Sequence, residues 1–96
     1  MDLGALTLET FEPHVGDAFT IRAQPADVEL VLESATTLGS RPGGRDPFTL
    51  VFRGPPEPAL SQRIYRLEHA PLGELEIFVV PVGRDAAGMS YEAIFT

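Results

Sequence analysis

The loop from Ser40 to Asp46 holds the residues whose types and spacing best suit ligand binding. Arg41 and Arg45 flank two consecutive glycines. Two guanidinium groups and freely oriented backbone N–H groups could therefore converge on a carboxylate or a phosphate. The loop lacks the spacing and the Lys-Ser/Thr ending of a nucleotide-binding P-loop. A flexible surface loop accounts for the same residues, so both interpretations stay open.

His69 is the second candidate for chemistry, and it ends an apolar row on a predicted strand. A histidine there could act as a general base or a metal ligand. It could equally be a half-buried residue that closes the turn at 70–73 through a backbone hydrogen bond. The other histidine, His14, follows a proline at a predicted helix end, where it could cap the last carbonyl groups. The two histidines are not spaced as a pair and the chain has no cysteine, so we expect no metal site.

Catalytic centres are poorly supported by the remaining polar residues. Ser61 and His69 could be combined with several acids into a triad, but no Gly-x-Ser-x-Gly motif is present. Glu68, Glu74 and Glu76 could be paired as in a glycosidase, yet they share a predicted face with arginines, which is typical of a solvated, charge-paired surface. We therefore expect no catalytic residues, no cofactor and no enzyme.

Apolar and polar side chains alternate along most of the chain, which is typical of β-strands. The candidate residues must therefore be positioned by strands and by the loops between them. The pattern predicts strands over residues 18–24, 28–33 with an extension toward 38, 48–53, 63–69, 74–80 and 91–95. Residues 83–90 are expected to connect the last two. Short connections rich in Gly, Pro and Asp favour antiparallel hairpins. In the hairpin of 63–69 and 74–80, we prefer the register that sets Arg66 against Glu76, because the alternative opposes Glu68 and Glu76.

The segment before the first strand predicts a helix of one or two turns. Thr7 is a suitable N-cap, but the reciprocal position of a capping box holds Thr10 instead of Glu, so we expect the box to be incomplete. This helix would plug an open end of the sheet. The whole chain, 1–96, is then one mainly β domain: a single small antiparallel β-barrel or two-layer β-roll of about six strands, with one short N-terminal helix.

Charge and hydropathy exclude several kinds of partner. The net charge is −7 and all seven basic residues are arginine. A surface of that sign repels phosphate backbones, so we expect no nucleic-acid binding. No stretch approaches the roughly 18 apolar residues of a membrane span, and the N-terminus lacks the features of a signal peptide, so we expect a cytoplasmic protein that does not bind membranes.

A second apolar set lies on the faces that the alternation makes outer. It consists of Val31, Ile64, Phe78, Val80 and Ile94. Five such residues suggest an apolar patch that must be covered. The helix and the proline-rich segment 54–58 could cover it, or it could be an interface with a protein partner or a second copy.

Four segments together resemble a family of small bacterial proteins described only as a domain of unknown function. They are FTLVFRGP at 48–55, YRLEH at 65–69, IFVVPVGR at 77–84 and YEAIF at 91–95. The resemblance implies no activity for any residue. It implies an assembly or adaptor role beside phage-tail-like proteins.

Two functional hypotheses follow. The first is a non-enzymatic interaction or structural module that binds a protein partner or self-associates, and it is the one we favour. The alternative is a small ligand-binding β-barrel or enzyme that uses Arg41, Arg45 and His69 around one pocket.

Overall fold

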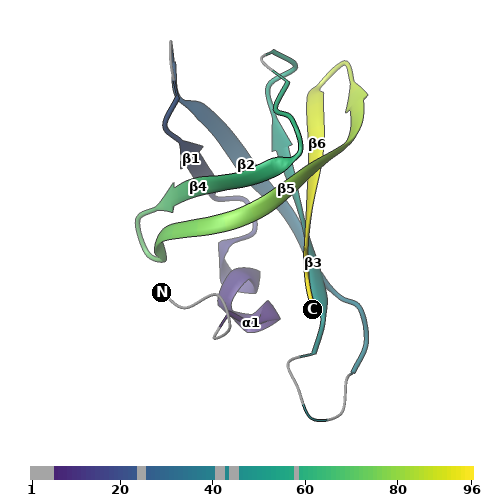
Figure 1. Ribbon diagram of the computed structural model, residues 1–96. Helices are drawn as coiled ribbons and strands as arrows, with labels where there is room; N and C mark the ends of the chain where they lie inside the picture. The colour runs from purple at the N-terminus through teal and green to yellow at the C-terminus, as the bar shows by residue number, and fades with distance from the viewer. Residues whose placement is uncertain (1–5, 24–25, 41–42, 44–45, 58) are drawn as a thin grey trace.

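The chain folds as one antiparallel sheet that closes into a ring. The computed structural model describes residues 6–23, 26–40, 43, 46–57 and 59–96. The strands are β1 (Ala18–Ile21), β2 (Val28–Thr37), β3 (Phe48–Gly54), β4 (Arg63–His69), β5 (Gly73–Asp85) and β6 (Gly88–Phe95). They follow one another around the ring in the order β1-β2-β3-β6-β5-β4 (Figure 1). Of the two architectures expected, the chain therefore adopts the closed antiparallel barrel.

The inward rows that the alternation predicts fill the barrel. Every second residue of β3 is buried, and Phe48, Leu50 and Phe52 are fully buried. Phe19 of β1 packs edge-on against Phe52 at 5.5 Å between ring centroids, and Phe48 stacks on Phe95 at 4.6 Å. Because the sheet closes on itself, rows from strands far apart in sequence meet in one core.

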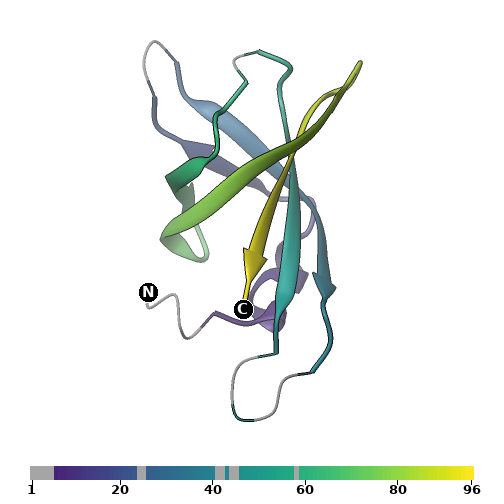
Figure 2. The same cartoon turned by 45° about the vertical axis from the view of Figure 1, so that its right-hand side comes forward.

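A short helix closes one end of the barrel, as expected. The helix α1 (Leu8–Phe11) and the 3-10 turn η2 (Glu12–His14) lie at the same end as the C-terminus (Figures 1 and 2). Phe11 is fully buried, and its ring lies 6.0 Å from that of Phe48 and 5.8 Å from that of Phe95. Among the described residues, no helix is long and apolar enough to cross a membrane.

The N-cap of this helix corrects one expectation. Thr10 Oγ1 accepts a hydrogen bond from the Thr7 backbone N–H at 3.1 Å, which is the contact that Glu makes in an ordinary capping box. The prediction of an incomplete box was wrong because a threonine hydroxyl reaches the N–H as well as a carboxylate does.

The β4–β5 hairpin has the register that charge pairing favours. Arg66 lies opposite Glu76 and Leu67 opposite Leu75, with three residues, 70–72, in the turn. One like-charged pair, Glu68 and Glu74, remains in this register. Arg22 and Arg66 offset it by forming ion pairs with the two glutamates.

The connection expected at 83–90 is instead part of a long hairpin. β5 continues through Pro81 to Asp85, and β6 starts at Gly88. The ladder shifts register between Pro81 and Gly83, and a bulge of this kind accommodates a proline within a strand. A turn of only two residues then joins the strands, so the prediction of an eight-residue connection was wrong.

β1 is shorter than expected and makes the weakest seam of the ring. It ends at Ile21, whereas the alternation continues through Ala23. It pairs with β4 at two positions only, Thr20 with Glu68 and Ile21 with Leu67. Beyond Ile21 the chain leaves β4, and the barrel opens at the end opposite α1 (Figures 1 and 2).

Candidate functional site

Both histidines meet one carboxylate at the closed end of the barrel. Asp17 Oδ2 lies 3.0 Å from His14 Nδ1 and 2.9 Å from His69 Nε2. The two imidazole rings are edge-on at 4.6 Å, and Phe19 stacks on the His69 ring at 4.3 Å. The His69 side chain is 3% exposed, while that of Asp17 is 44% exposed. We refer to His14, Asp17 and His69 as the His–Asp–His cluster.

Backbone hydrogen bonds place Asp17 at the centre of the cluster. Its N–H donates to the His14 carbonyl at 3.0 Å, and its carbonyl accepts the Leu32 N–H at 3.0 Å. Gly16, which has a φ of 97°, donates its N–H to the Leu32 carbonyl at 2.7 Å. A positive φ is easily adopted only by glycine, so this residue type permits the bend that carries the chain from η2 into β1.

The hydrogen bonds of His69 define its tautomer. The Leu72 backbone N–H donates to His69 Nδ1 at 3.3 Å, so Nδ1 is an acceptor. The proton of the neutral ring must then be on Nε2, which donates to Asp17. These hydrogen bonds, first that of His69 and then that of His14, hold the pKa of Asp17 below its ordinary value of 3.8.

The cluster offers a metal-ligand set that its hydrogen bonds do not favour. Its three ligand atoms lie within 4.8 Å of one another, which is close enough for one ion. A metal-bound histidine, however, normally donates its second ring N–H to an acceptor. In His69 that second nitrogen faces the Leu72 N–H, a donor. The three side chains therefore suit a structural hydrogen-bond cluster that links η2, β1 and β4 better than they suit a metal centre.

General-base chemistry at His69 has little geometric support. Both ring nitrogens are engaged and the side chain is buried. Within the described part of the chain, no serine or tyrosine hydroxyl is bonded to either histidine of the cluster. The contact with Leu72 is the turn-closing hydrogen bond that was one of the two interpretations of His69. His14 bonds to Asp17 and was not predicted to do so.

The two arginines predicted to bind a ligand, Arg41 and Arg45, lie outside the described residues. Whether they share a pocket with His69 therefore stays a prediction. Their loop joins the end of β2 to the start of β3.

The outer apolar set is exposed instead of covered. Val31, Ile64, Phe78 and Ile94 are between 41% and 61% exposed, and Val80 is partly buried. The helix does not cover them, because its buried residue, Phe11, enters the barrel end. The interpretation in which the helix and proline segment bury this set is wrong for the four exposed residues.

The set also divides into separate parts around the barrel. Ile64 and Phe78 are direct partners in the β4–β5 ladder. Ile94 pairs with Thr49 of β3, and Val31 is flanked by Ala18 and Arg53. Only Ile64 and Phe78, with Val80 two positions further along β5, form a continuous apolar row.

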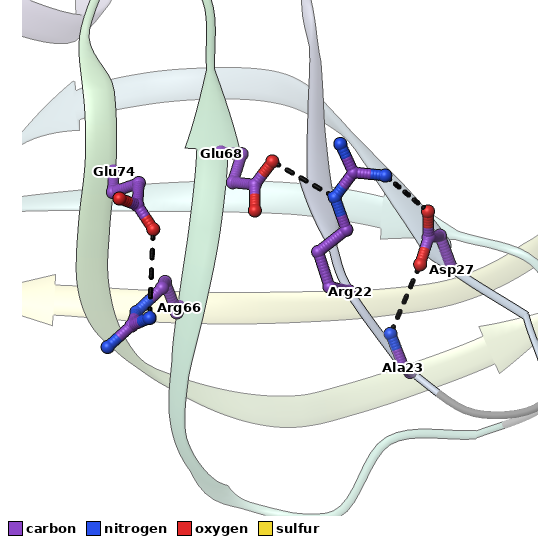
Figure 3. A network of polar contacts seen from close by, with 6 residues as sticks. All are labelled: Arg22, Ala23, Asp27, Arg66, Glu68 and Glu74. Atoms are coloured by element: carbon purple, nitrogen blue, oxygen red, sulfur yellow. Dashed lines mark hydrogen bonds and ion pairs between the residues drawn. The ribbon is translucent and has the colours of Figure 1, made fainter.

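A polar network that the sequence did not indicate stands at the β1–β4 seam (Figure 3). Arg22 donates to Glu68 of β4 at 3.1 Å and to Asp27 at 2.8 Å. Asp27 in turn accepts the Ala23 N–H at 3.2 Å. The network links Arg22 and Ala23 to Asp27 and ties Arg22 to β4 just beyond the end of β1. Alternation alone could not show this, because Arg22 occupies an ordinary outward position.

The fold and its internal contacts define a class: a small, closed, six-stranded antiparallel β-barrel with one end plugged by a short helix. Residues 6–95 match the family model of a domain of unknown function, DUF6916, so the chain belongs to that family. The comparisons found no matching curated protein and no matching solved structure.

Proposed function

We propose that this domain is a non-enzymatic interaction module that binds another protein chain through the outer face of β4 and β5. In this proposal it is cytoplasmic, and it acts as an assembly or adaptor component of a multi-protein system such as a phage-tail-like one. The partner is a different protein or a second copy of the chain. The proposal needs no cofactor and no reacting group.

One observation carries the proposal: two large apolar side chains are paired on the solvent side of the sheet. Ile64 is 61% exposed and Phe78 is 49% exposed, and they face each other across the β4–β5 ladder. An aromatic residue beside an aliphatic one is the type of pair that anchors protein interfaces. Lone exposed residues such as Leu38 are ordinary on a surface, whereas a paired row is what a partner would cover.

The ligand-binding or enzymatic alternative has less support. His69 has both nitrogens engaged, as described above, so it lacks the free base that the alternative requires. Phosphate backbones are also poor partners, because the net charge is −7 and four of the described arginines are ion-paired with carboxylates.

The proposal is tested by removing the apolar pair and leaving the fold intact. We expect the double variant Ile64→Ser/Phe78→Ser to lose a partner, or self-association, that the wild type shows. Leu38→Ser is the matched control, because Leu38 is 50% exposed and lies at the far end of β2. The measurements are light scattering for self-association and quantitative affinity capture for a partner. A wild type that stays monomeric and captures nothing beyond what the double variant captures would contradict the proposal.

A further inference from the structure

The end of the barrel opposite α1 is an open mouth. A groove of about 1220 Å³ lies there, with the β1–β2 hairpin forming one wall and the segment after β3 forming the other. Its lining includes Val28, Leu60, Arg63 and Tyr65. Tyr91 accepts the Leu60 N–H through its hydroxyl at 2.9 Å and so holds the second wall against the core. We refer to this groove as the barrel mouth.

β4 borders the barrel mouth with an edge that has no ladder partner among the described residues. On its β1 side, β4 pairs only at Leu67 and Glu68. Among the described residues, 63–66 have ladder partners on the β5 side alone. At about 3.3 Å per residue, this free edge is roughly 13 Å long. β1 ends at Ile21, and Arg22 and Ala23 then bond to Asp27 (Figure 3).

Arg63 places an unpaired cation in the barrel mouth. It shares the inward face of β4 with Tyr65 and Leu67, whereas Ile64 and Arg66 point outward. Of the five arginines that the structure describes, it is the one without a carboxylate partner. Its guanidinium carbon lies 5.5 Å from the Tyr65 ring centroid. The Tyr65 hydroxyl donates to the Ser61 carbonyl at 2.8 Å, which fixes the ring beneath the cation.

We propose that the barrel mouth binds an extended peptide segment of a partner protein, which adds as a strand to the edge at 63–66 and places an Asp or Glu side chain on Arg63. Main-chain hydrogen bonds to a free edge bind peptides in this way in several domains. The inference rests on the proposed function in that the domain acts by binding protein, but it uses a different surface.

Geometry and charge narrow the sequence of the peptide. β1 closes the seam at Leu67, but a peptide along the edge can run in either direction relative to β4. In both directions the residue opposite Arg63 lies two positions from the residue opposite Tyr65, which suits an apolar side chain. The predicted motif is Asp/Glu-x-apolar, read in either chain direction. The net charge of −7 repels strongly acidic peptides, so one carboxylate is favoured over several.

The test is selection from a displayed library of random octapeptides on the immobilised wild-type protein. We expect enrichment of extended sequences with the Asp/Glu-x-apolar motif. Synthetic versions should shift the amide NMR signals of residues 63–66. Peptides N-methylated at the alternate positions whose N–H groups face β4 should lose binding, whereas methylation of the other alternate positions should leave it. Absence of enrichment, enrichment of unrelated motifs, or signal shifts elsewhere in the barrel would overturn the inference.

Charge variants test the role of Arg63 directly. Arg63→Gln should weaken the selected peptides about tenfold, the size expected for one charge-assisted hydrogen bond. Arg84→Gln is the matched control, because Arg84 lies on β5 outside both the edge and the groove lining, and this variant should leave binding unchanged. Equal loss in both variants, or binding of sodium acetate to the same amides with no peptide binding, would contradict a peptide site.

The peptide site and the outer-face interaction can be tested independently of each other. If the barrel mouth is the peptide site, the single variant Phe78→Ser, on β5 and outside the edge, still binds the selected peptides while its outer-face binding is weakened. Loss of peptide binding in Arg63→Gln alone, with outer-face binding retained, supports the inference independently of the outer face.

Discussion

Asp17 Oδ2 accepts the Nε2–H of His69 at 2.9 Å, although the two residues are 52 positions apart in the sequence. The contact ties the segment that follows the N-terminal plug to the last residue of β4. It also gives a nearly buried imidazole a partner on each nitrogen, which is the condition for keeping such a group inside a protein. The contact therefore has measurable consequences for stability.

Replacing His69 with Ala should lower the free energy of unfolding by about 2–4 kcal/mol, because a buried side chain, its stacking on Phe19 and two hydrogen bonds are all lost. His14→Ala should cost less, since the His14 side chain is more exposed and has one hydrogen bond to the cluster. Urea unfolding monitored by circular dichroism measures both. Equal losses of unfolding free energy in the two variants would contradict the larger contribution expected from the buried His69.

Acid should weaken the fold through Asp17. Its folded pKa lies below 3.8, so its stabilising contribution is fully present above about pH 4 and is lost as the pH falls through the lowered value. Urea unfolding between roughly pH 2 and pH 6 should therefore show a smaller pH dependence in Asp17→Asn than in the wild type. The pKa of Asp85 is also lowered, first by its hydrogen bond to Arg53. The same measurement on Asp85→Asn therefore separates the pH dependence of stability that comes from Asp85 from the part that comes from Asp17. An unchanged slope in Asp17→Asn would contradict the assignment.

Phe11→Ala should destabilise the barrel by about 3–5 kcal/mol, because it leaves a cavity between the plug and two core rings. Val15→Ala is the control: it lies just beyond η2, is 46% exposed, and should change stability by less than about 0.5 kcal/mol. Denaturant titration distinguishes the two variants. A small effect of Phe11→Ala would mean that the strands close the barrel without the plug.

Gly88→Ala should be more harmful than Gly73→Ala. Both glycines have positive φ, 139° and 82°, so each substitution carries backbone strain of about 1 kcal/mol. A Cβ at Gly88 would also strike the carbonyl of Gly54, whereas nothing lies within 4 Å of a Cβ at Gly73. The clash should add about 1–3 kcal/mol. Thermal unfolding of the two variants checks the difference, and similar melting temperatures would contradict it.

Local pattern was sufficient to predict much of this fold. Alternation identified the inward rows, and opposed charges at Arg66 and Glu76 gave the register of β4 and β5. The long β5–β6 hairpin was missed because Pro81 and the glycines around it resemble a loop, and only the ladder to β6 shows that a bulge accommodates them.

The site contacts could not be predicted from spacing, because they arise only when the ring closes. Asp17 meets His69 because β1 pairs with β4, two strands that are separated in the sequence by β2 and β3. Arg63 likewise looks like any strand residue until the early end of β1 leaves its edge open. Side-chain contacts between strands far apart in the sequence depend on the order of strands in the sheet. The alternation of apolar and polar residues does not reveal that order.

Because the β1–β4 pairing is short, local opening of the barrel there carries a risk of aggregation. A ring joined there by two residue pairs should open at that place first, and opening would expose two full strand edges to other molecules. The ion pair from Arg22 to Glu68 spans this joint. Loss of this ion pair should therefore make transient opening of the ring, and with it edge-to-edge association, more frequent.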